Sequence, residues 1–255
     1  MLLHDSSYPL ILKTLRDEEE KINFFMQKEE KRVLKDFERR ACMALPFPYV
    51  YHTVYQMPAS KNTYLCWFKV SNKIDLARKI CIGDAALILN DNKGKFSVYG
   101  ISSYASPDGG KSPFLYIYTA HFFSRYRERF RWGGSLSTND LIARFFSRNS
   151  RYQFVLDFGK MNLNAEQYKD GSAFQIPDGI AFATAKTIQD DNSKNCDVIR
   201  FNTFIGFDQL KNEQTDSVYT IDDYKELLAE EVKAILSKNK KLYETFFQKS
   251  PLESQ

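Results

Sequence analysis

Two β-rich stretches separated by a helical segment constrain the fold of this chain more than any other feature. Short apolar runs alternate with turns rich in Asp, Asn and Gly in residues 49–118 and again in residues 152–207. Apolar runs bounded by such turns predict antiparallel strands joined by hairpins. Neither stretch has enough strands and covering helix to be stable alone, so we expect one continuous sheet with a shared core.

Helical periodicity appears between the two β-rich stretches. One helix is predicted over residues 119–132, where a Gly-Gly pair follows and favours a C-terminal end. A second helix is predicted to begin near Ser137, which opens a capping-box spacing with Asp140. The sequence therefore predicts an α+β fold, in which two helices are inserted in a mostly antiparallel sheet.

Both ends of the chain also favour helix. Residues 16–44 hold eight acidic and eight basic side chains around a thin apolar stripe. We expect an amphipathic helix packed on the domain, with an arm that binds a partner as the alternative. A second apolar stripe predicts a C-terminal helix at 220–248. With an α+β core at 49–215, the chain is predicted to be a single domain, 1–255, with a helix at each terminus.

Composition and motifs argue against several classes of protein. The 255 residues carry a net charge of +4, and no apolar run reaches the length of about 18 residues that a membrane span needs, so we expect no membrane partner. The start lacks an export signal, and four widely spaced cysteines fit reduced thiols, which favours a cytoplasmic location. Without a glycine-rich phosphate loop or a metal-ligand spacing, we expect neither a cofactor nor a metal.

The candidate chemistry lies in the segment that begins at His121 and reads HFFSRYRERF. Drawn as a helix, it has a face of aromatic residues. The adjoining face carries four polar residues: His121, Arg125, Glu128 and Arg129. Paired arginines bind a phosphate and stabilise the charge that gathers on it. Histidine and glutamate serve as acid and base. These four residues are the predicted catalytic set.

The surroundings of this segment favour nucleic acid as a partner. Seven arginines and two acidic residues lie between His121 and Arg151, interleaved with Phe, Tyr and Trp. A basic, aromatic-rich segment suits a phosphodiester ligand with stackable bases. We therefore predict nucleic-acid contacts from five further arginines of this segment, Arg127, Arg131, Arg144, Arg148 and Arg151, and a contact from a second side by Arg200 on the last predicted strand. The alternative is an arginine-rich helix that is solvated or paired with acidic groups of its own chain.

A strand ending in Tyr-Thr-Ala-His, followed by Phe-Phe-Ser-Arg-Tyr-Arg-Glu-Arg-Phe, resembles a helix found in small bacterial proteins. It is similar to the H-A-x-x-R-x-x-E-R helix of the RelE-like and barnase-like ribonuclease toxins. The resemblance implies RNA cleavage without a metal. His121 or Glu128 would act as base or acid, and Arg125 and Arg129 would hold the phosphate.

Three functional interpretations remain at this point. The first is a metal-independent RNA-cleaving protein of toxin-like type, and the second is a nucleic-acid-binding protein without catalysis. The third is a non-enzymatic interaction or structural protein of a bacterial family. They differ in whether the face with His121, Arg125 and Glu128 is open, flat or buried. The sequence does not identify a protein partner.

Overall fold

The computed structural model describes residues 2–105, 111–129, 135–149, 154–156, 171–190, 193–215 and 218. The chain divides into two compact units, Met1–Thr215 and Asp216–Gln255. The helix predicted at 220–248 lies outside the described residues, and every contact given below belongs to the first unit.

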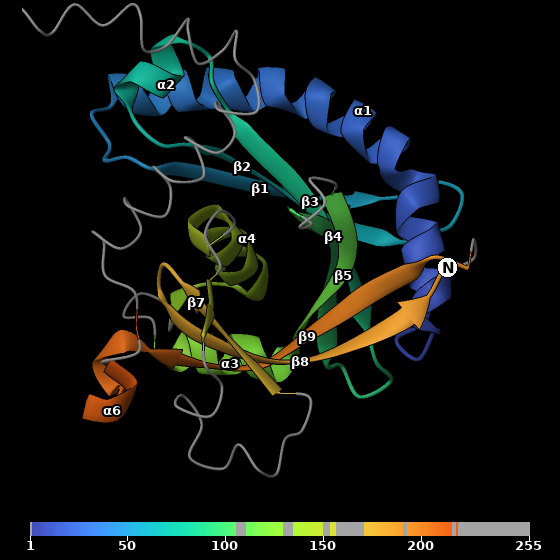
Figure 1. Ribbon diagram of the computed structural model, residues 1–255. Coiled ribbons are helices and arrows are strands. Elements are labelled where there is room, and N and C mark those ends of the chain that lie inside the picture. Colours follow the sequence, from blue (N-terminus) through green and yellow to red (C-terminus); the bar gives the residue numbers. More distant parts are fainter. Residues whose placement is uncertain are drawn as a thin grey trace, which may run out of the picture. The chain divides into compact units, whose positions relative to one another are not determined.

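One continuous sheet forms the centre of this unit (Figure 1). In the described residues it has nine strands, in the order β1-β2-β3-β4-β5-β9-β8-β7-β6. The strands are β1 (Tyr49–Gln56), β2 (Thr63–Val70), β3 (Ile82–Asn90), β4 (Phe96–Ala105), β5 (Lys111–Thr119), β6 (Phe154–Leu156), β7 (Gly171–Ile176), β8 (Gly179–Gln189) and β9 (Asn195–Gly206). All neighbours are antiparallel except β5 and β9. The predicted α+β fold, with a mostly antiparallel sheet continuing across the inserted helices, is confirmed.

The parallel pair of β5 and β9 follows from the two helices that the chain inserts after β5. The chain leaves β5 through α3 (Ala120–Arg129) and α4 (Thr138–Asn149), then enters β6 at one edge of the sheet. Strands β7, β8 and β9 return to the middle, so that β9 lies beside β5. Parallel neighbours need a long crossover of this kind, whereas antiparallel neighbours need only a tight turn.

The N-terminal helix α1 spans Tyr8–Cys42 and lies along one face of the sheet (Figure 1). It begins earlier than the predicted start at residue 16. Its first turns carry Ile11, Leu12 and Leu15, which are buried, whereas the prediction began at the charged cluster that follows them. The predicted apolar stripe lies in the core, with four members buried: Ile22, Met26, Val33 and Phe37. The helix is therefore packed on the domain and is not a free arm.

Three short helical elements were not predicted: α2 (Lys73–Ala77), the 3₁₀ helix η3 (Phe207–Gln209) and α6 (Asn212–Thr215). Each is one turn or little more, and so short a segment shows no helical periodicity of apolar residues. The Asn72 side chain caps α2 by accepting a hydrogen bond from the Asp75 amide. This is a local signal that a search for capping residues detects.

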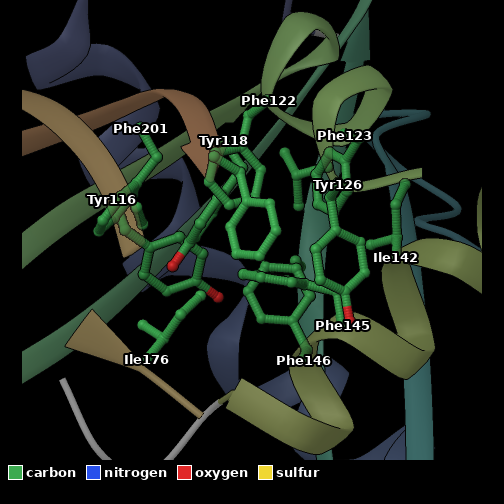
Figure 2. Packing of buried hydrophobic residues seen from close by; sticks show 14 of the residues in the cluster. Tyr116, Tyr118, Phe122, Phe123, Tyr126, Ile142, Phe145, Phe146, Ile176 and Phe201 are labelled. Atoms are coloured by element: carbon green, nitrogen blue, oxygen red, sulfur yellow. The ribbon is translucent and has the colours of Figure 1, made fainter. Parts of the chain in front are cut away.

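Apolar side chains cover both faces of the sheet. One cluster, here called the α1 core, packs α1 on its face. The other, the α3–α4 core, is strongly aromatic: the ring of Tyr118 stacks on Phe201 at 4.3 Å and meets Phe122 and Phe145 edge-on. Figure 2 shows the rings of α3 and α4 converging on the tyrosines of β5. Because this core holds one side of α3, its other side is turned outward.

Candidate functional site

Thr119, the last residue of β5, fixes the start of α3. Its hydroxyl oxygen accepts a hydrogen bond from the Phe122 amide at 3.2 Å, as an N-cap residue does. The same hydroxyl donates to the carbonyl of Phe201 in β9 at 3.2 Å. One side chain therefore ties the helix to two neighbouring strands, and the position of His121 relative to the sheet follows from it.

A β-bulge in β9 completes the seat of α3. The pairing with β8 shifts between Phe182 and Ala183, where Asn202 is the extra residue. Without an extra residue, Phe201 and Phe204 would point to opposite faces of the sheet. With it, both rings lie in the α3–α4 core and contact Phe122.

The two faces of α3 differ as the helical pattern predicted. Phe122, Phe123 and Tyr126 are buried, and the first two make edge-on ring contacts with Phe145 of α4. The remaining side chains reach solvent. His121, Ser124 and Glu128 are exposed, and the arginines of the helix are half-buried: Arg125, Arg127 and Arg129.

Arg125 and Glu128 form an ion pair on this outward face. The Arg125 Nη1 donates to the Glu128 Oε2 at 2.9 Å, and the two side chains are 43% and 53% exposed. The Ser124 hydroxyl donates to the other oxygen of Glu128 at 3.4 Å. The hydrogen bond from Arg125 holds the pKa of the Glu128 carboxyl below its usual value. Glu128 is therefore an oriented carboxylate at neutral pH.

The surroundings of Arg129 are less favourable for its positive charge. Partial burial lowers the pKa of its guanidinium, and repulsion from the charge of Arg125 lowers it further. Attraction to Glu128 and to Asp208 of η3 opposes the shift. Two neighbouring guanidinium groups, one of them partly desolvated, create a local positive potential that an anion relieves.

His121 is the least engaged of the four predicted catalytic residues. It is exposed in the first turn of α3, and among the described residues it has no hydrogen-bond or ion-pair partner. An imidazole in this state is available to a ligand on the outward face. The structure therefore brings His121, Arg125, Glu128 and Arg129 onto one helix surface.

The other arginines of α3 and α4 have different surroundings. Arg127 donates to the carbonyl of Leu136, and to the Thr138 hydroxyl at 3.4 Å, so it holds the segment before α4. Arg144 is exposed on α4. Arg131 and Arg151 lie outside the described residues.

Arg148 of α4 belongs to a structural network that sequence reasoning missed. It binds the Asp178 carboxylate through Nε and Nη2, and Tyr126 and Asn149 donate to the same carboxylate at 2.7 and 2.8 Å. Burial acts to raise the pKa of Asp178, but these hydrogen bonds outweigh it and hold the pKa below its usual value. The Asp178 side chain is 5% exposed. Arg148 therefore contributes to the fold, because it compensates a buried charge.

Arg200 lies on the sheet face opposite to α3. Its neighbour Phe201 points into the α3–α4 core and Val198 into the α1 core, and alternate residues of a strand point to opposite faces. Burial raises the pKa of Tyr99 in the α1 core, and the nearby charge of Arg200 opposes that shift. The structure does not bring Arg200 together with His121.

A contact between a histidine and an aspartate joins β1 to α4. The Nδ1 atom of His52 lies 3.5 Å from an oxygen of Asp140. The Ser137 hydroxyl donates to the other oxygen of Asp140 at 2.6 Å and accepts from its amide, so Ser137 caps α4 at the position that the capping-box spacing predicted. His52 of β1 thus contacts a residue in the first turn of α4.

Comparison of the chain with protein-family models, with curated proteins and with solved structures found no match. Among the described residues there is no helix with the length and apolar character that crossing a bilayer requires. The geometry of α3 is therefore the basis on which a function can be proposed for this chain.

Proposed function

We propose that the protein binds RNA through the outward face of α3 and cleaves it there without a metal ion. One observation supports this most: His121, Arg125 and Glu128 are all solvent-accessible on one side of a helix whose other side is buried. Side chains held on such a rigid element keep their spacing when a ligand binds.

The spacing of these residues suits a phosphodiester. Arg125 follows His121 by one helical turn, and Glu128 follows Arg125 by slightly less, or about 6 and 4.5 Å along the axis. A phosphate on Arg125 therefore has His121 on one side and Glu128 on the other. Arg129 adds a second positive charge, which stabilises the pentacoordinate phosphate as negative charge gathers on it.

Glu128 and His121 divide the proton transfers between them. The Glu128 carboxylate accepts the proton of the 2′-hydroxyl, whose oxygen forms a bond to phosphorus. The bond between phosphorus and the 5′-oxygen breaks, and protonated His121 donates a proton to the leaving oxygen. The products are a 2′,3′-cyclic phosphate and a free 5′-hydroxyl.

The Arg125–Glu128 ion pair gives substrate binding a second effect. The hydrogen bond from Arg125 makes Glu128 a weak base by lowering its pKa. A phosphate that takes over the Arg125 guanidinium removes this hydrogen bond, and the pKa of Glu128 then returns toward its usual value. Substrate binding thus frees the base that the reaction requires.

The test is cleavage of a short single-stranded RNA by the purified full chain, with and without EDTA. The proposal predicts equal rates under both conditions and a product that ends in a 2′,3′-cyclic phosphate. A substrate with a single 2′-deoxy substitution at the cut site must resist, because it lacks the nucleophile.

The same RNA distinguishes binding from cleavage. If the chain binds the RNA in a salt-dependent manner but leaves it intact, the face is a binding surface without catalysis. If it neither binds nor cleaves, the non-enzymatic interaction or structural role takes precedence. Loss of cleavage in EDTA contradicts a metal-independent mechanism.

A further inference from the structure

Strand β1 forms one edge of the nine-stranded sheet, and among the described residues no strand pairs with its outer side. The opposite edge, β6, has three residues in the part of the chain that the structure describes, whereas β1 has eight. All eight pair with β2 in one continuous register without a bulge. The outer side of β1 is therefore a long and regular row of backbone groups.

The sequence of β1 lacks the features that keep an edge strand from pairing with another chain. Natural edge strands carry Lys or Pro, contain bulges, or stay very short. Strand β1 reads YVYHTVYQ, without Lys, Arg, Asp, Glu or Pro. Most of its residues are aromatic or β-branched, which are the residue types that favour strands. An uncharged edge of this length is suited to pairing with a further strand.

The hairpin between β1 and β2 determines which backbone groups of β1 point outward. The Met57 amide donates to the Asn62 carbonyl at 2.8 Å, directly after the last pair of the two strands. Hydrogen-bonded and non-hydrogen-bonded pairs alternate along an antiparallel ladder. The odd-numbered residues of β1 therefore bond to β2. The even-numbered residues direct their amide and carbonyl groups away from it: Val50, His52, Val54 and Gln56.

This edge of the sheet is open to solvent. Tyr49 is the only residue of β1 that is buried. Val54 is 48% exposed, although it is a large apolar residue in the middle of the edge, and Gln56 is exposed beside it. A partner strand at this edge would cover Val54 and bond to the outward backbone groups.

A second copy of β1 can join this edge only in certain registers. In an antiparallel pair, residues whose backbone groups point toward the partner lie opposite one another. A twofold axis must therefore pass through a residue of β1, because an axis between two residues would place an outward residue opposite an inward one. An axis at Thr53 places Val50 opposite Gln56 of the other copy, and His52 opposite Val54.

The register centred on Thr53 also brings together side chains that stabilise a sheet. Tyr51 of each copy lies opposite Tyr55 of the other, and the two Thr53 side chains face each other. Aromatic pairs and Thr–Thr pairs are among the stabilising cross-strand pairs. The register centred on His52 has the same length but places two imidazoles opposite each other and requires Tyr49, which is buried. Thr53 is therefore the favoured centre.

Helix α1 holds both tyrosines in place before two copies meet. The Phe25 ring stacks on Tyr55, with the ring centroids 4.2 Å apart. Arg32 donates a hydrogen bond to the Tyr51 hydroxyl, and its guanidinium lies 5.3 Å from the centroid of the same ring. Side chains that are already fixed lose little conformational freedom on association. The edge is thus a preformed contact surface.

We propose that two copies of the chain associate through β1, which pairs antiparallel with β1 of the second copy about a twofold axis at Thr53. One sheet then continues through both copies. Because the strand is uncharged, the two copies do not repel each other there, and because both use the same edge, the assembly closes at two. The contact is separate from the proposed RNA-binding face, since α3 packs on β5 and β9 in the middle of the sheet.

Analytical ultracentrifugation of the full chain at micromolar concentration tests the association. We expect the natural chain to sediment as a dimer. Val54→Pro removes one outward amide and leaves the ladder to β2 intact, as proline does where the amide of an edge strand faces solvent. This variant should sediment as a monomer. Val54→Ala is the matched control, because it keeps the amide and should remain a dimer.

Cysteine crosslinking tests the register. Opposite residues at a non-hydrogen-bonded position have Cα atoms about 4.5 Å apart, which is within the range of a disulfide. In a Cys42→Ser background, which removes an exposed thiol, Thr53→Cys should form a disulfide between two chains under mild oxidation. Gln56→Cys is the control. Its two thiol-bearing residues would lie about 20 Å apart, six residues along the strand at about 3.4 Å each.

Three results overturn the proposal. The first is a natural chain that stays monomeric at high micromolar concentration. The second is a dimer that Val54→Pro leaves intact, because the contact then lies elsewhere. The third is crosslinking of Gln56→Cys as fast as that of Thr53→Cys, which indicates random collision. Melting curves show whether each variant folds, and Thr53→Cys keeps the test valid if Val54→Pro does not fold.

Discussion

The hydroxyl of Tyr126 donates a hydrogen bond of 2.7 Å to Asp178, and so connects the buried side of α3 to the turn between β7 and β8. The same carboxylate receives Arg148 and Asn149 from α4. Three elements thus share one acidic group, which is why the outward face of α3 has a fixed position. Asp178 therefore connects the core of the fold to the helix that carries the proposed site.

Arg148→Ala should destabilise the first unit by about 1–3 kcal/mol, because it leaves the buried Asp178 with neutral donors only. The larger loss of stability that follows from breaking a fully buried ion pair does not apply here. The Arg148 side chain is 48% exposed, so solvent screens its charge. Urea unfolding measures the loss. Arg144→Ala, an exposed arginine on the same helix, is the control and should change stability little.

The Asp178 carboxyl should also make stability depend on pH. Its pKa in the folded protein is below the ordinary 3.8, so it contributes stability above that pH. This contribution falls as the pH drops below 3.8 toward the folded-state value. Asp178→Asn should therefore be less stable than the natural chain at neutral pH. The difference should shrink in acid, and a difference that stays constant from neutral pH to about pH 2 contradicts this role.

Thr119→Val should weaken the attachment of α3 by removing both the cap to Phe122 and the bond to Phe201. Loss of an N-cap costs about 1 kcal/mol of stability. Thr119→Ser keeps the hydroxyl and should retain most of it. Thermal unfolding distinguishes the two variants, and equal stability of both would show that the hydroxyl does not hold the helix.

RNA binding should be electrostatic and should depend on Arg125, Arg129 and Arg144. For each phosphate contact removed by an alanine substitution, the slope of log affinity against log salt should flatten by about 0.7 for single-stranded RNA. Arg78→Ala is the charge-matched control, since Arg78 is exposed at the end of α2, away from α3. Equal loss of affinity in the control would indicate nonspecific attraction to positive charge.

Local sequence patterns predicted the features of the fold that depend on residues close together in the chain. The division of α3 into an aromatic and a polar face follows from the helical period, whereas the ion pair between Arg125 and Glu128 was not predicted. Strand runs and turns likewise predicted the antiparallel sheet. The predicted beginning of α1 is too late in the sequence. The first turns of the helix are apolar because they pack in the core, and they lack the charged residues on which the prediction depended.

Contacts between distant residues could not be predicted in this way. Arg148 and Asp178 are far apart in the sequence, and the only signal at Asp178 is a Pro-Asp-Gly turn that says nothing of its partner. The face to which Arg200 points depends on strand register. A cavity beside α1 lies where the pairing between β3 and β4 ends, and the extent of that pairing is a property of the folded sheet.

The proposed function requires that His121 acts on RNA bound to the outward face of α3. Its most direct test is the single-turnover rate of RNA cleavage in EDTA, measured for the natural chain and for His121→Ala. Because His121 is exposed, the variant should fold normally and lose about 10²- to 10⁴-fold in rate, as expected for a general acid. Arg78→Ala should cleave at the natural rate. Equal rates for the natural chain and His121→Ala, or no cleavage by the natural chain, would contradict the claim.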